Sequence, residues 1–240
     1  MEEIRYGYSP PRQVAEDLWE IRGEWSNKFG RRMTIIRLRD GRLLIHSSIC
    51  LREGDLGWLR SIGTPAFIVA PNRFHCSNAG WMSERFPGAE LYVPNSQLAA
   101  FRKKGLKAKD VNEEFPRHLE AEILCIPMHG TRVEEAAFVH IPSRTLVLCD
   151  LAFNMPDVFT GFERVVMRWN QVGGQFGPSK LTRWLFTKDR SRLVESYRRL
   201  LEQPFDRVIV NHGEVLEAGG RELLRSGVVR IFGPWKENNS

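Results

Sequence analysis

The 240-residue chain lacks several features that would place it in a particular class of protein. No apolar run approaches the roughly 20 residues that a membrane-spanning helix needs, so we expect no such helix and no membrane partner. The first ten residues, MEEIRYGYSP, are acidic and polar, which predicts no signal peptide and a cytoplasmic location. Internal repeats and low-complexity linkers are also absent, and the length suits one domain over residues 1–240.

Cysteine pairs with metal-site or redox spacing are missing as well. The four cysteines stand singly, without C-x-x-C spacing, at Cys50, Cys76, Cys125 and Cys149. Neither a zinc knuckle nor a redox pair is therefore expected, and reduced, mostly buried thiols are the simplest interpretation.

The chain has no acidic excess, because its basic residues outnumber its acidic ones and its formal net charge is +6. Much of the positive charge lies in local runs such as residues 102–104, and such runs usually form the solvated face of a helix. Nucleic acid is thus not the partner we expect, although a nucleic-acid-processing factor remains an alternative.

Apolar segments with strand and helix patterns alternate along the chain, which indicates an α/β protein. Asp40-Gly41 predicts a hairpin turn, with the hairpin at one edge of a sheet, and Asn95 is a candidate N-cap. Residues 152–187 have no clean period and many aromatics, which suggests a cap or lid. The predicted strands are Leu18–Ile21, Met33–Leu38, Arg42–Ile49, Ala66–Ala70, Leu91–Val93, Ile123–Met128, Ala136–Ile141, Thr145–Cys149 and Arg207–Val210. The predicted helices are Leu51–Ile62, Trp81–Phe86, Gln97–Lys104, Arg190–Leu201 and Arg221–Leu224.

Four of these strands run into a side chain that can bind a metal ion: His75, His129, Asp150 and His212. Sites in such sheets gather beyond the carboxyl ends of strands, so the four side chains could converge. Each one alone is more often an ordinary polar residue at a strand end. Three imidazoles and one carboxylate suit zinc, and iron or manganese nearly as well.

The order of these elements, together with three segments, resembles the metallo-β-lactamase superfamily over essentially the whole chain. The segments are RLLIHSS at residues 42–48, APNRFH at residues 70–75 and RTLVLCD at residues 144–150, and they are most similar to an uncharacterised branch. The resemblance implies an αββα sandwich of two mixed sheets packed face to face. It also implies a metal site along one edge of the sandwich.

The superfamily motif H-x-H-x-D-H is matched only in part, by RFHCSN at residues 73–78. His75 keeps the middle histidine, whereas Arg73 and Asn78 replace the two outer ones and a serine replaces the aspartate. The resemblance assigns His129 to the third motif, and Asp150 and His212 to the bridging and final ligand positions. Where the first motif expects an aspartate, this chain has His46.

The remaining ligands support one divalent metal rather than two, with zinc favoured. We therefore predict a metal-dependent hydrolase acting on an ester, amide or phosphoester, with Asp150 and His212 as the catalytic residues. The alternative is a binding protein of the same fold, without a metal, whose site has become vestigial. The substrate and the oligomeric state stay open. Residues expected near the metal or in the pocket are His46, which is otherwise a core histidine, Arg73, Cys76, which is otherwise a buried thiol, Asn78 and Asn211.

Overall fold

The computed structural model describes residues 7–23 and 30–234, and the chain divides into two compact units, Met1–Cys125 and Ile126–Ser240. A single domain over residues 1–240 and a lid over residues 152–187 stay predictions. Among the described residues, no helix combines the length and the apolar character needed to cross a bilayer.

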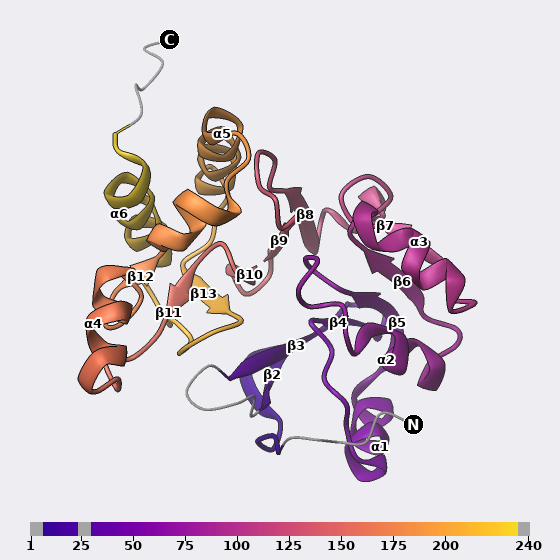
Figure 1. Cartoon of the computed structure of the whole chain (residues 1–240). Coiled ribbons are helices and arrows are strands. Elements are labelled where there is room, and N and C mark those ends of the chain that lie inside the picture. Colours follow the sequence, from indigo (N-terminus) through magenta and orange to yellow (C-terminus); the bar gives the residue numbers. More distant parts are fainter. Residues whose placement is uncertain (1–6, 24–29, 235–240) are drawn as a thin grey trace. The chain divides into compact units, whose positions relative to one another are not determined.

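The first unit is built on a seven-stranded mixed sheet, drawn from indigo to magenta in Figure 1. Strands β1 to β4 pair antiparallel, and β4 to β7 pair parallel. In sheet order the strands are β1 (Arg12–Ala15), β2 (Leu18–Gly23), β3 (Arg31–Arg37), β4 (Arg42–His46), β5 (Thr64–Val69), β6 (Glu90–Val93) and β7 (Ala108–Asp110). The helices of this unit are α1 (Glu53–Ile62), α2 (Ala79–Arg85), α3 (Asn95–Lys103) and the 3₁₀ turn η1 (Arg117–Leu119).

Side-chain alternation along the strands builds the core of this unit. Ile35 and Ile45 lie on one face of the sheet and belong to the same buried cluster as Leu59 of α1 and Met82 of α2. The helices thus cover this face because their apolar residues recur at helical spacing.

The Asp40-Gly41 hairpin forms as predicted, and Gly41 has the positive φ of +82° that the turn requires. Its predicted place at a sheet edge is wrong, because β4 also pairs with β5 and the hairpin lies inside the sheet. The N-cap prediction for Asn95 is wrong too, because this residue opens α3 and Pro94 precedes it as the cap. A turn specifies which two strands it joins, whereas a strand's other neighbour depends on tertiary pairing.

A buried ion pair in this sheet predicts a large loss of stability. Glu20 on β2 contacts Arg32 on β3, and each side chain is only 2% exposed. Glu20→Gln should lower the free energy of unfolding by about 3 kcal/mol, because it leaves a buried guanidinium without its carboxylate. Asp17→Asn is the matched control, since it removes a partly exposed partner of Arg37 and should cost less than about 1 kcal/mol. Equal shifts in urea denaturation of the two variants would contradict this.

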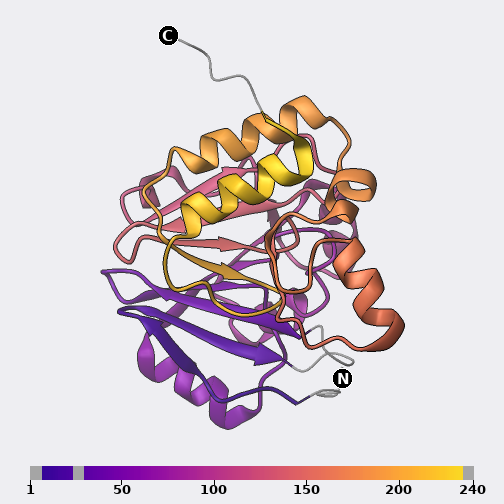
Figure 2. The same ribbon diagram turned by 90° about the vertical axis from the view of Figure 1, so that its left-hand side faces the viewer.

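The second unit contains a four-stranded mixed sheet and a two-stranded sheet. Figure 2 shows helices α5 and α6 lying side by side across the four-stranded sheet, where the rings of Tyr197 and Phe232 are 5.9 Å apart. The larger sheet has the order β13 (Arg207–Val210), β10 (Thr145–Leu148), β9 (Ala136–His140) and β8 (Ile123–Pro127), and the smaller one pairs β11 (Phe153–Asn154) with β12 (Phe176–Gly177). The helices are α4 (Gly161–Trp169), the π-helix η2 (Thr182–Phe186), α5 (Arg190–Leu201) and α6 (Gly220–Phe232).

Residues 152–187 are more regular than the sequence suggested. They contain β11, α4, β12 and η2, whereas we found no clean period there. Helix α6 is also longer than the predicted Arg221–Leu224, because apolar residues continue at helical spacing to Phe232 and are buried. Both differences come from segments where glycines interrupt the pattern.

Candidate metal centre

Asp150 and His212 lie together at the carboxyl ends of two neighbouring strands. Strands β10 and β13 pair in parallel with Leu148 opposite Val210, so the residues two positions further along also meet. Asp150 Oδ1 is 3.1 Å from His212 Nε2, and both side chains are buried. Asn211, the predicted pocket residue directly before His212, is also buried. Parallel register is therefore what brings a carboxylate and an imidazole to one point.

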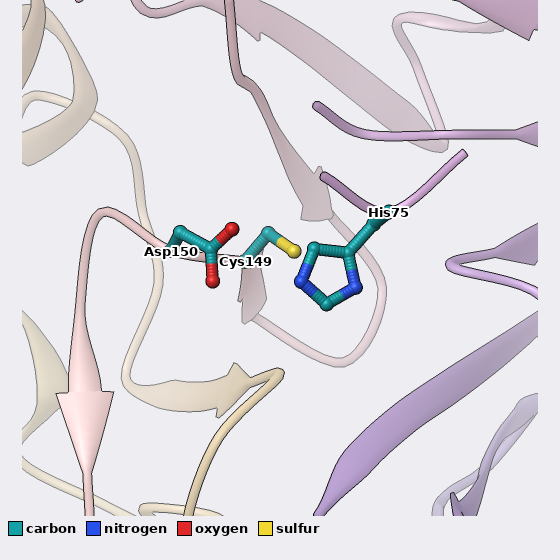
Figure 3. Close-up of side chains that lie close together, drawn as sticks. All are labelled: His75, Cys149 and Asp150. Atoms are coloured by element: carbon teal, nitrogen blue, oxygen red, sulfur yellow. The ribbon is translucent and has the colours of Figure 1, made fainter. Parts of the chain in front are cut away.

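Cys149 is a possible metal donor that the sequence analysis missed. Figure 3 shows its side chain next to that of Asp150 where β10 ends, with Sγ and a carboxylate oxygen within 4.8 Å of each other. Consecutive residues of a regular strand point to opposite faces of the sheet, so two adjacent side chains do not normally reach one ion. The strand ends at Leu148, however, so this alternation no longer applies to the two residues.

Glu135, directly before β9, fixes the backbone that carries these donors. Its side chain is fully buried and accepts hydrogen bonds from the backbone N–H of Cys149 at 2.7 Å and of Asp150 at 2.8 Å. This role was not predicted from the sequence. The available signal was a carboxylate directly before an apolar, fully buried strand, where an unsatisfied charge would be costly.

Tyr197 of α5 supports the next residue of the same segment. Its hydroxyl donates to the carbonyl oxygen of Leu151 at 2.6 Å. Burial, and secondarily the negative charge of Glu135, raises the pKa of Tyr197 well above its usual value. The phenol therefore stays protonated and keeps donating over the whole physiological pH range.

His212 is held by its neighbours as well as by Asp150. The ring of Phe153 stacks on its imidazole with centroids 6.0 Å apart and an angle of 16° between the planes. The His212 carbonyl accepts a hydrogen bond from the backbone N–H of Asn154 at 3.2 Å. These contacts restrict the orientation of the ring, which a metal ligand requires.

His129 follows β8 as predicted, but it does not join this pair among the described residues. Its side chain is exposed, whereas its backbone N–H donates to Ser196 Oγ on α5 at 2.9 Å. The structure therefore holds the His129 backbone firmly and leaves its ring to solvent.

In the first unit, His75 lies in the loop after β5 and is buried (labelled in Figure 3). The buried Asn72 shapes this loop, because its Oδ1 accepts hydrogen bonds from the backbone N–H of Phe74 and of His75 at 2.9 and 3.1 Å. Ser47 Oγ lies 3.3 Å from His75 Nδ1, at hydrogen-bonding distance. The other ring nitrogen, Nε2, is then the one suited to a metal.

His46, where the superfamily motif expects an aspartate, lies on β4 and is buried. Burial, and secondarily the charge of His75, lowers the pKa of His46 to about 3. The imidazole is therefore neutral at physiological pH, as a core histidine would be.

The other predicted pocket residues occupy the segment between β5 and α2. Arg73 is exposed, with its guanidinium 5.7 Å from the ring centroid of Phe74. Cys76 is buried and its thiol donates to the carbonyl oxygen of Asn72 at 3.2 Å, which fits a structural thiol. Asn78 precedes α2 at the N-cap position, without a side-chain hydrogen bond that caps the helix.

No protein-family model and no curated protein matches the chain. Solved structures match it over both units. The DIM-1 metallo-β-lactamase superposes with a TM-score of 0.63 and 11% identity, covering 94% of this chain and 99% of that one. The metallo-β-lactamase from Hirschia baltica gives a TM-score of 0.59 and 14% identity, with 95% and 99% covered. The chain has the metallo-β-lactamase fold.

A second group of structures with this fold is also similar. The flavodiiron core of Flv1 from Synechocystis has a TM-score of 0.66 and 11% identity, covering 94% of this chain and 61% of that chain. The fold that the sequence predicted, with two mixed sheets and helices, is thus confirmed. At identities this low the likeness concerns the fold alone.

Proposed function

We propose that this protein of metallo-β-lactamase fold is a metal-dependent hydrolase, and that Asp150 and His212 are the centre of a site for one divalent ion. The observation that carries the proposal is the 3.1 Å separation of Asp150 Oδ1 and His212 Nε2. Two ligand atoms at about 2.0–2.2 Å from one tetrahedral ion are roughly 3.4 Å apart, so this pair fits an ion with little movement.

Beside Asp150, Cys149 offers a soft sulfur as a further donor. His75, in the first unit, stays a predicted ligand, and because its Nδ1 lies against Ser47, its Nε2 is the nitrogen suited to a metal. Imidazole, carboxylate and thiolate together favour zinc over iron or manganese. His129 remains a predicted ligand, but its exposed side chain makes it the least favoured of the four residues from the sequence analysis.

A divalent ion bound there would lower the pKa of a water molecule towards neutrality and polarise the ester, amide or phosphoester bond to be cleaved. The residues of the chain supply the rigidity that such chemistry needs. Glu135 and Tyr197 hold the backbone around Asp150, so its carboxylate is oriented before a substrate arrives. Phe153 covers one face of the His212 ring and limits the access of water to it.

Metal content tests the first step of the proposal. Purified protein, stripped with chelator and reconstituted with zinc, should contain about one ion per chain by elemental analysis. Asp150→Asn and His212→Ala should each reduce this to about a tenth of an ion or less. The matched controls are Asp157→Asn and His118→Ala, which change the same residue types at exposed positions and should leave the stoichiometry unchanged.

Two results would count against the proposal in different ways. Less than about a tenth of an ion per wild-type chain, after incubation with zinc, iron or manganese, would remove the metal site itself. One ion per chain without hydrolysis of any chromogenic ester, amide or phosphoester would leave a metal-binding protein of this fold that is not a hydrolase. Hydrolysis that disappears in folded Asp150→Asn, but not in Asp157→Asn, would support the enzyme.

A further inference from the structure

Helix α4 carries an apolar stripe that faces solvent. Phe162, Val165, Val166 and Trp169 recur at the spacing of one helix face, and they are 83%, 64%, 42% and 61% exposed. Only Met167 of this helix is buried. Figure 2 shows α4 projecting from the edge of the second unit. A stripe at this spacing normally packs against a protein core, so its exposure indicates an interaction surface.

The π-helix η2 extends the same surface. Trp184 and Leu185 are 70% and 59% exposed, and Trp184 lines a hollow of about 270 Å³ together with Trp169 of α4. The backbone N–H of Leu181 donates to Asn170 Oδ1 at 2.8 Å, which links the segment before η2 to the end of α4. The two helices therefore present one aromatic surface.

Basic side chains surround these apolar ones. Residues 160–188 contain five cationic side chains and a single acidic one, Glu163. Lys180 Nζ lies 4.7 Å from the ring centroid of Trp169, and Arg183 lies 5.0 Å from that of Trp184. The negative charge of Asp157, just outside the segment, is shared by the remaining two arginines, Arg164 and Arg168.

We propose that α4 and η2 form a docking surface for an anionic lipid membrane. Protruding aromatic and aliphatic side chains ringed by lysine and arginine suit the boundary between acyl chains and negatively charged headgroups. This surface would lie on the membrane without crossing it. It departs from our expectation of no membrane partner, which was based on the absence of a membrane-spanning segment.

The charges favour a membrane over the other occupants. A second copy of the chain, joined by a two-fold axis, would bring the two sets of cations against each other. Nucleic acid would match the positive charge and could stack on tryptophan, but it offers no partner for Val165, Val166 and Leu185. An anionic bilayer accepts both the cations and the aliphatic side chains.

Vesicle co-sedimentation tests the inference independently of the metal site. The wild-type chain should bind phosphatidylcholine vesicles containing about 30% phosphatidylserine, bind pure phosphatidylcholine at least about fivefold less, and lose binding as salt rises. The double variant Phe162→Glu/Val165→Glu should lower the bound fraction at least about tenfold, because it places two carboxylates in the apolar stripe. Leu223→Glu, at a 44% exposed position of α6, is the matched control and should bind like wild type.

Each of the other outcomes would overturn the inference. Absence of binding to either vesicle, or equal binding by the wild type and the double variant, would show that α4 does not contact lipid. A wild-type dimer in sedimentation velocity that the double variant converts to a monomer, without vesicle binding, would assign the surface to self-association. RNA binding abolished by the double variant, again without vesicle binding, would assign it to nucleic acid.

Discussion

Replacing Glu135 with alanine is expected to lower the free energy of unfolding by about 3 kcal/mol, because two buried N–H groups lose the carboxylate that accepts their hydrogen bonds. These are the backbone N–H groups of Cys149 and Asp150, which bond to the two carboxylate oxygens. Urea denaturation followed by circular dichroism measures the change.

A matched pair of amide variants distinguishes the loss of the hydrogen bonds that Glu135 accepts from the loss of its negative charge. Glu135→Gln keeps the shape but turns one acceptor into a donor facing an N–H, so we expect a loss of about 2 kcal/mol. Glu134→Gln removes the same charge from the preceding, partly exposed residue and should stay within about 0.5 kcal/mol of wild type. If Glu135→Gln were as mild as Glu134→Gln, the two hydrogen bonds would not stabilise the fold.

The same variant addresses the proposed metal site. Because Glu135 holds the backbone of Asp150, Glu135→Gln should weaken zinc binding by about tenfold in a competition titration, even at a temperature where the variant is folded. Glu134→Gln should bind zinc as wild type does. Unchanged affinity in Glu135→Gln would limit this glutamate to a purely structural role.

Gly213→Ala should be at least as damaging, with an expected loss of more than about 3 kcal/mol. Gly213 has a φ of +106°, and a Cβ there would lie 2.1 Å from the carbonyl oxygen and 2.3 Å from the carbonyl carbon of Asn154. Both neighbouring atoms belong to the backbone of β11, so the chain itself would have to move. His212 directly precedes this glycine, so metal content should fall together with stability.

Gly219→Ala is the control for Gly213→Ala. Gly219 also has a positive φ, +72°, but the nearest atom to its Cβ would be Leu223 Cδ1 at 3.9 Å. Backbone strain without a clash should cost about 1 kcal/mol. Thermal unfolding of the two variants distinguishes them. Similar melting temperatures would mean that the backbone of β11 can move at little cost in free energy.

His129 and His212 are each followed by a glycine, and the structure explains both pairs. A Cβ on Gly130 would lie 2.3 Å from the carbonyl oxygen of Asp189. A Cβ on Gly213 would clash in the same way with the backbone of Asn154. In both places another backbone segment packs directly against the residue after a predicted ligand. The sequence shows the two His-Gly pairs, but not which segment requires them.

The sequence by itself determined much of the local structure and predicted two residues of the candidate site. Alternating apolar residues, the Asp40-Gly41 turn and the helical pattern of residues 190–201 predicted elements that the structure contains. Asp150 and His212 were predicted because each follows a buried strand, and the end of a strand can be recognised from the order of residues along the chain. These features depend on neighbours in the chain, and so they could be read without a fold.

Only the tertiary structure decided the remaining features. The order of strands in the sheet, the support from Glu135 and Tyr197, and the place of Cys149 depend on segments far apart in sequence. The apolar stripe of α4 is the clearest example. Its spacing predicts a helix, but it does not predict whether the apolar face of that helix points to the core or to solvent. Whether an apolar face turns to the core or to solvent depends on which surfaces the rest of the fold leaves unburied. In this chain the core is complete without that stripe, and it faces outward.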